Sequence, residues 1–186
     1  MSFRRMQWLF PVALTLHNGE EALSMPSWDL NHKSQIPLHP PAAAIWLALL
    51  VLTAGGYVIT ALSAKRGRQS VPAYLLFGSI AALLINVFVP HIPAAIVFKG
   101  YAPGVVTAVL INLPLMSILL RQAVRDQWVS GSKAVLYSVL VPLALACSIV
   151  VYFALVLGAS HRILYALPLT DKARHRRALS PTPLTC

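Results

Sequence analysis

Long apolar stretches separated by short basic loops dominate the pattern of hydrophobic and polar positions along this chain. Four stretches contain no Asp, Glu, Lys or Arg: residues 41–63, 71–98, 103–120 and 134–158. A helix needs roughly 17 to 25 such residues to cross the hydrocarbon layer of a membrane. The pattern therefore predicts four membrane-spanning helices.

A fifth segment, at the amino terminus, is interrupted by polar residues. Residues 6–16 are apolar, but the segment reaches spanning length only if His17, Glu20 and Glu21 lie inside its helix. We therefore expect an all-α, polytopic integral membrane helical bundle with about five transmembrane helices. Residues 1–160 would form its single domain, and the basic, proline-bearing residues 161–186 predict a disordered tail.

The amino-terminal segment also fits a secretory signal peptide. Arg4 and Arg5 would be its basic end, residues 6–16 its apolar region, and Ala22 and Ser24 its small-residue cleavage site. Cleavage there would remove the whole HNGEE sequence. A mature protein that begins near Met25 would support this alternative.

Composition supports a membrane protein. The chain is 58% hydrophobic and 11% charged, with a mean hydropathy of +0.70, which is too apolar for an ordinary soluble domain. The net charge of +10 comes from loops and the tail, without a groove-reading motif, so we expect no nucleic-acid partner. Cys147 and Cys186 form neither a disulfide framework nor a paired-thiol metal motif.

The basic residues of the short loops predict the orientation. Cytoplasmic loops carry an excess of Lys and Arg. Lys33 and Lys99 fall on one side of the predicted spans, and most of the others fall on the opposite side: Arg4, Arg5, Lys65, Arg66, Arg68, Arg121, Arg125 and Lys133. We expect a cell (cytoplasmic) membrane protein with a cytoplasmic amino terminus. Five spans would place the basic tail outside, against the same rule, and a first segment that does not span would change the count.

The HNGEE sequence brings three ionisable side chains together. His17, Glu20 and Glu21 are spaced i, i+3 and i+4, so a helix places them on one face. Carboxylates at membrane depth are costly and normally face a bundle interior, bind a metal or find a partner. In the alternative interpretation the helix ends at Leu16, and the three residues form a solvated helix end.

Two further segments carry polar residues at the same depth. Asn86 and His91 lie in LINVFVPHIPAA, where two prolines predict irregular backbone around a pocket, although a lone membrane histidine is often a packing residue. Tyr101, Thr107 and Asn112 lie in YAPGVVTAVLINLP, and the last two are more often helix-to-helix hydrogen bonders. All three segments reach the outer half of the membrane. We expect one polar pocket of His17, Glu20, Glu21, Asn86, His91 and Tyr101, supported by Thr107 and Asn112.

These motifs resemble a known family. HNGEE, the later His91 and YAPG, which contains Tyr101, Pro103 and Gly104, are similar to the HXXEE domain family of small integral membrane proteins. The resemblance covers residues 17–104. No activity is established for this family, so it implies a membrane-integral protein whose three motifs act together, and it names no reaction.

The leading functional hypothesis is a metal-dependent membrane enzyme. His17, Glu20 and His91 would bind zinc or iron, and an open position would activate water for hydrolysis of a lipid-like substrate. Glu20, Glu21 and His91 are the candidate catalytic residues, one glutamate binding metal while the other acts as general base.

Three alternatives remain open. A metal-free acid–base isomerase or cyclase of a lipid or isoprenoid would use a protonated glutamate as its acid. A proton-coupled transporter or small binding protein would use histidine and glutamate as a proton relay. An assembly subunit would use them only to form a complex.

Overall fold

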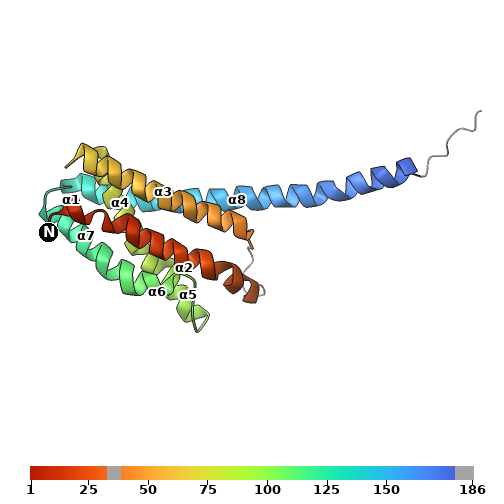
Figure 1. Ribbon diagram of the computed structural model, residues 1–186, viewed down its shortest axis with the longest axis horizontal. Coiled ribbons are helices and arrows are strands. Elements are labelled where there is room, and N and C mark those ends of the chain that lie inside the picture. Colours follow the sequence, from red (N-terminus) through yellow and green to blue (C-terminus); the bar gives the residue numbers. More distant parts are fainter. Residues whose placement is uncertain (33–38, 179–186) are drawn as a thin grey trace, which may run out of the picture. The chain divides into compact units, whose positions relative to one another are not determined.

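All regular elements in the described part of the chain are helices, which confirms the all-α prediction (Figure 1). The computed structural model describes residues 1–32 and 39–178. The elements in chain order are α1 (Phe3–Met6), α2 (Leu9–Asn31), α3 (Ala42–Arg66), α4 (Val71–Asn86), η1 (Val87–His91), α5 (Ile92–Val97), α6 (Val105–Thr107), η2 (Ala108–Asn112), α7 (Leu113–Arg125) and α8 (Gly131–Ala178).

Four helical stretches are long and apolar enough to cross a membrane. They are Ala42–Arg66, Val71–Val97, Val105–Arg125 and Gly131–Gly158, which overlap the four predicted spans. Helix α2 has 23 residues, enough in length, but its polar side chains keep it outside this group. The chain is thus a polytopic membrane bundle, and the fifth span stays a prediction.

Helix α2 passes through the HNGEE sequence without interruption. It continues beyond Leu16 to Asn31, and the His17 side chain is only 1% exposed. The interpretation in which the helix ends at Leu16 and leaves a solvated terminus is therefore wrong. The helix persists because its neighbours cover the polar face that would otherwise need water.

The bundle core lies between α2, α4 and α7. Phe10, Leu76, Ile80, Met116 and Leu119 are almost completely buried there. Helix α2 runs beside α3, α3 beside α4, and α4 beside α7, as Figure 1 shows. Many apolar side chains on the outward faces of α3 and α8 are exposed, which suits helices that a bilayer surrounds.

Two stretches of π-helical backbone interrupt this regular packing. The first, η1, follows Asn86 and contains Val89, whose φ of −149° and ψ of 109° are extended. Pro90 has no N–H group and favours an extended residue before it, so the predicted irregular backbone is confirmed. The second, η2, begins directly after Thr107. Both lie next to residues of the predicted pocket.

The described chain divides into two compact units. The first contains Met1–Ile149 and the second begins at Val150. We predicted a disordered tail over residues 161–186. Helix α8 is described to Ala178. Residues 179–186 and Lys33 lie outside the described residues. The boundary between domain and tail therefore stays a prediction.

Candidate metal centre

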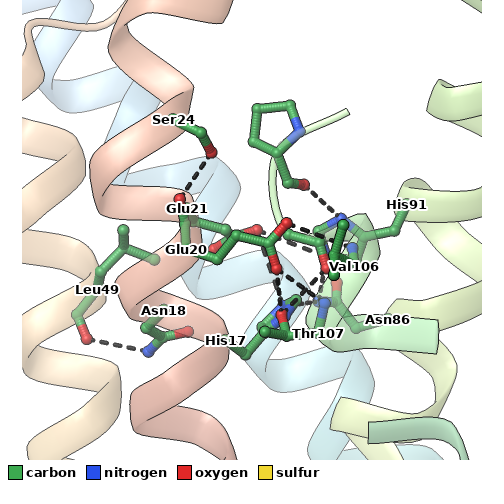
Figure 2. A network of polar contacts seen from close by, with 12 residues as sticks. His17, Asn18, Glu20, Glu21, Ser24, Leu49, Asn86, His91, Val106 and Thr107 are labelled. Atoms are coloured by element: carbon green, nitrogen blue, oxygen red, sulfur yellow. Dashed lines mark hydrogen bonds and ion pairs between the residues drawn. The ribbon is translucent and has the colours of Figure 1, made fainter. Parts of the chain in front are cut away.

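Three segments of the chain meet at one polar cluster, as the sequence predicts (Figure 2). Helix α2 contributes His17, Glu20 and Glu21, and the end of α4 with η1 contributes Asn86 and His91. The loop before α6 and α6 itself contribute Tyr101, Pro103, Gly104 and Thr107. His17 and His91 are 1% and 3% exposed, so both imidazoles lie inside the bundle.

Glu20 is an anchoring carboxylate with four hydrogen bonds. Its Oε1 accepts from the Tyr101 hydroxyl at 2.9 Å and from the Val106 N–H at 3.3 Å. Its Oε2 accepts from the Thr107 N–H at 2.8 Å and from the Thr107 hydroxyl at 2.6 Å. Glu20 therefore joins α2 to the start of α6, where the free backbone N–H groups of a helix favour a carboxylate.

The Thr107 hydroxyl fixes the tautomer of His17. Because its single proton goes to Glu20 at 2.6 Å, the hydroxyl oxygen accepts from His17 Nδ1, which lies 2.9 Å away. The proton of neutral His17 is then on Nδ1, and Nε2 keeps its lone pair. Glu20 thus orients His17 through Thr107 without touching it.

A backbone carbonyl fixes the tautomer of His91 in the same way. His91 Nδ1 lies 2.8 Å from the Pro103 oxygen, and a carbonyl can only accept, so Nδ1 donates. Nε2 of His91 therefore also carries a lone pair. Metal-binding histidines commonly have this arrangement, in which the second ring nitrogen donates to a carbonyl or carboxylate.

The two Nε2 atoms lie close to the same carboxylate oxygen. Glu21 Oε1 lies 3.5 Å from His91 Nε2 and 3.9 Å from His17 Nε2, and all three atoms lie within 4.8 Å of one another. A tetrahedral zinc ion with bonds of about 2.0–2.1 Å holds its ligand atoms roughly 3.3 Å apart. Movements of about 1 Å or less would therefore bring these atoms to bonding geometry. We call His17, Glu21 and His91 the metal triad.

The cluster has an excess of negative charge. In the described part of the chain, no Lys or Arg forms an ion pair with Glu20 or Glu21. Two carboxylates beside two neutral imidazoles in a buried site need a compensating cation or proton. At the cluster edge, burial raises the pKa of the Tyr101 phenol, which keeps the hydroxyl protonated as a donor to Glu20.

Gly104 allows the YAPG loop to lie directly over the metal triad. Its φ is +79°, and a Cβ at this position would lie 2.6 Å from Cε1 of His91, 2.9 Å from Cε1 of His17 and 3.0 Å from Cγ of Glu21. A side chain here would be strained and would displace the ligands. The glycine of YAPG is therefore required by both conformation and space.

The structure changes two of the predicted roles. We named Glu20 as the metal ligand, but the group that could hold a metal contains Glu21 instead. One residue step turns a helix by about 100°, which directs Glu20 toward Thr107 and Glu21 toward the histidines. Asn112 is fully buried, and no hydrogen bond links it to the cluster; neither of its amide atoms has a partner among the described residues.

Sequence reasoning missed the backbone groups of the site. The Pro103 carbonyl and the Val106 N–H have no side-chain signal, so only the fold reveals them. It also missed Trp28, whose Nε1 donates to the Tyr101 carbonyl at 2.9 Å and ties the YAPG loop to α2. A tryptophan near the end of a membrane helix is a common interfacial anchor, and that signal could have identified it.

Comparison with known proteins supports the grouping of these motifs. The model of a family described as "Protein of unknown function with HXXEE motif" matches residues 8–119, a region that holds the whole cluster. A relative from Bacillus subtilis (strain 168), Uncharacterized protein YrkK, is 28% identical over 145 residues, which cover 77% of this chain and 90% of the relative. No solved structure matches the chain significantly.

Proposed function

This chain belongs to the HXXEE family, and we propose that it is a metal-dependent membrane enzyme whose His17, Glu21 and His91 hold one zinc or ferrous ion. The observation that carries the proposal is that the Nε2 atoms of both histidines lie within 4 Å of the same Glu21 carboxylate oxygen. Hydrogen bonds to Thr107 and Pro103 hold both rings in the tautomer that a metal needs.

Charge supports a divalent cation in particular. A divalent ion would balance the charges of ionised Glu20 and Glu21 beside neutral histidines without a further residue. Two histidines and one carboxylate form a frequent ligand set for catalytic zinc and for non-haem iron. Both ions leave coordination positions open with such a set, which is what a reaction at the metal requires.

The proposed reaction class is hydrolysis, in which a metal polarises a carbonyl and lowers the pKa of bound water. Glu21 and His91, predicted as catalytic residues, act here as ligands. Glu20 acts as a positioning residue for His17 through Thr107. The Glu21 side chain is 13% exposed, against 1% for His17, so Glu21 marks the accessible edge of the cluster.

Apolar surroundings support a lipid-like substrate. At the edge of the cluster, the apolar side chain of Val106, whose N–H bonds Glu20, is 48% exposed. A molecule that approaches the cluster from the membrane would cross this apolar surface. A lipid-like molecule gains free energy there, whereas a strongly polar one would lose its hydration.

The orientation is also part of the proposal. The backbone N–H of Phe3 donates a hydrogen bond to the carboxylate of Asp126, which lies between α7 and α8. Arg4, Lys65 and Arg68 line one cavity at the same end of the bundle. This clustering of basic residues supports a cytoplasmic amino terminus and a metal triad in the outer half of the cell membrane. Reporter fusions at the amino terminus and after Lys99 test it. If a reporter that is active only in the cytoplasm is active after Lys99, the proposed orientation is wrong.

Metal analysis of the purified full-length protein tests the metal centre. Protein prepared in detergent without chelator should contain about one zinc or iron ion per chain, and His17→Ala and His91→Ala should lose it. His39→Ala is a matched control, because His39 pairs with Asp29 outside the cluster and should leave the metal content unchanged. Folded wild-type protein that binds no added zinc or ferrous ion would overturn the proposal.

A turnover assay then separates the enzyme from its alternatives. Hydrolysis of lipid esters by the wild type should stop on chelation and return when the metal is restored. Conversion that survives chelation but is lost in Glu21→Gln would instead support the metal-free acid–base isomerase.

A further inference from the structure

Asn86 occupies the position between the two histidines of the metal triad. It is the last residue of α4, directly before the π-helical segment that carries His91. Its Nδ2 lies 2.8 Å from Nε2 of His91 and 3.1 Å from Nε2 of His17. Figure 2 shows its carboxamide between the two rings. Within the described part of the chain, Asn86 is the side chain that hydrogen-bonds both of these nitrogens.

The hydrogen bonding of Asn86 is matched to the metal-free state. Both Nε2 atoms are acceptors, because Nδ1 of each ring donates to Thr107 or Pro103. A carboxamide nitrogen carries two hydrogens, one for each lone pair. Asn86 therefore satisfies the two atoms that a metal would use, and an ion cannot bind them while the NH₂ group faces them.

We infer that the Asn86 carboxamide turns over when metal binds, so that its carbonyl oxygen replaces its NH₂ group and becomes a fourth ligand beside His17, Glu21 and His91. The inference rests on the metal centre proposed above. The carboxamide has nearly the same shape in both orientations, so rotation about its Cβ–Cγ bond exchanges donor for acceptor without moving the backbone. The same side chain then stabilises the histidines without metal and binds the metal when it is present.

The fourth ligand also bears on the identity of the ion. Four protein ligands enclose a tetrahedral zinc ion, as in structural sites, whereas an ion with octahedral coordination keeps two positions open. An enzyme with this ligand set is therefore better served by ferrous iron than by zinc. Carboxylate, carbonyl and imidazole ligands together suit such an ion.

The decisive experiment compares the metal affinity of full-length wild type with that of Asn86→Leu, by competition with a chromophoric chelator for zinc and ferrous ions. Leucine has the same number of side-chain heavy atoms but neither donates nor coordinates. If Asn86 is a ligand, Asn86→Leu should weaken binding by about 10- to 100-fold. If Asn86 only blocks the nitrogens, the same change leaves the affinity unchanged or raises it, and the inference is wrong.

Asn112→Leu is the matched control for this comparison. Asn112 is a buried asparagine at the end of the π-helical segment η2, and no hydrogen bond joins it to the metal triad. Its replacement should leave the metal affinity within about twofold of wild type, which is the scatter expected of a distant site. A loss equal to that of Asn86→Leu would assign the effect to general damage and overturn the inference.

Asn86→Asp keeps the experiment informative if Asn86→Leu does not fold. Aspartate offers an oxygen ligand but no N–H group, so metal should bind at least as tightly as in wild type, while the metal-free protein should melt at a lower temperature. Weaker binding in Asn86→Asp would contradict the inference. Protein with ¹³C-labelled asparagine gives a direct readout, because metal should shift an amide carbonyl infrared band that is missing from Asn86→Leu.

These outcomes distinguish the two proposals. Wild-type protein that binds no metal removes the metal centre itself. Wild-type protein that binds metal, with Asn86→Leu binding equally well, leaves the metal centre intact and removes only the role of Asn86.

Discussion

The two ends of the bundle each contain a buried polar cluster, and the two clusters differ in how their acceptor atoms are arranged. At the basic end, the Gln7 amide donates to the Arg4 carbonyl at 2.9 Å and accepts from Ser63 at 2.9 Å, and Ser63 accepts from the Trp128 indole at 3.0 Å. Every hydrogen-bonding atom named in this Gln7 network has a partner of the opposite kind. At the other end, the metal triad brings three acceptors together.

The difference separates a structural network from a functional one. Buried polar groups that pair completely add rigidity, and Gln7 and Ser63, both 0% exposed, do so between the amino terminus and α3. Converging acceptors repel one another unless a proton, an N–H donor or a metal lies between them. Asn86 supplies such N–H donors to the two histidines, and the Glu21 carboxylate lies close to both Nε2 atoms, which is expected where the cluster binds a cation.

The largest expected effect comes from exchanging the two adjacent glutamates of HNGEE for glutamine. Glu21→Gln removes a charged ligand and should weaken zinc or ferrous binding by more than about 100-fold. Residues that only hydrogen-bond a metal ligand typically change the affinity by about 10- to 100-fold. Glu20→Gln only loosens His17 and should weaken it by about 10-fold. Chelator competition on both purified variants measures the ratio.

The reverse order would restore Glu20 as the ligand and remove Glu21 from the metal triad. Asp29→Asn is the matched control, because Asp29 pairs with His39 away from the cluster. It should leave the metal affinity unchanged. Gln122→Glu would be unsuitable, since Gln122 donates to Asp126.

The next largest effect is expected for Gly104→Ala. The methyl group would collide with both imidazoles and Glu21 at a φ that alanine rarely adopts, so the loop must move. Thermal unfolding in detergent should show a destabilisation of roughly 1–3 kcal/mol, and metal affinity should fall with it. Gly55→Ala is the matched control, since nothing lies within 4 Å of its Cβ position. Equal behaviour of the two variants would mean that the loop does not cover the triad.

Much of this architecture follows from the sequence, and the reason is physical. Apolar length fixes the four spans, and the i, i+3, i+4 spacing of HNGEE fixes one face of α2, so both predictions hold. The irregular backbone near His91 follows from Pro90. These features depend on residues that are close together in the chain, so a single sequence is enough to predict them.

The division of labour between Glu20 and Glu21 could not be predicted. Both lie on the same face of α2, and their roles are decided by what packs against them, chiefly the N–H groups of Val106 and Thr107. Asn112 shows the same limit, because a polar residue on a membrane helix does not reveal from sequence which side chains surround it. Contacts between distant segments require the fold.

A smaller effect, on stability alone, is expected for Ser63→Ala in the Gln7 network. The change leaves the Trp128 indole N–H and the Gln7 carbonyl oxygen buried without this partner, which should cost about 1–3 kcal/mol in the free energy of unfolding. Unfolding in detergent measures it, and metal content should not change. Loss of metal in Ser63→Ala would show that the two ends are coupled and that the contrast drawn between them is false.

The smallest effect, and the only gain, is expected for Asn112→Leu. Asn112 belongs to neither cluster: both its amide atoms are buried, and among the described residues they accept from and donate to nothing. Replacing an unpaired buried amide by an apolar side chain with the same number of heavy atoms should stabilise the protein by about 1 kcal/mol, seen as a higher melting temperature in detergent. A lower melting temperature would mean that Asn112 has a binding partner, as its predicted role in supporting the pocket requires.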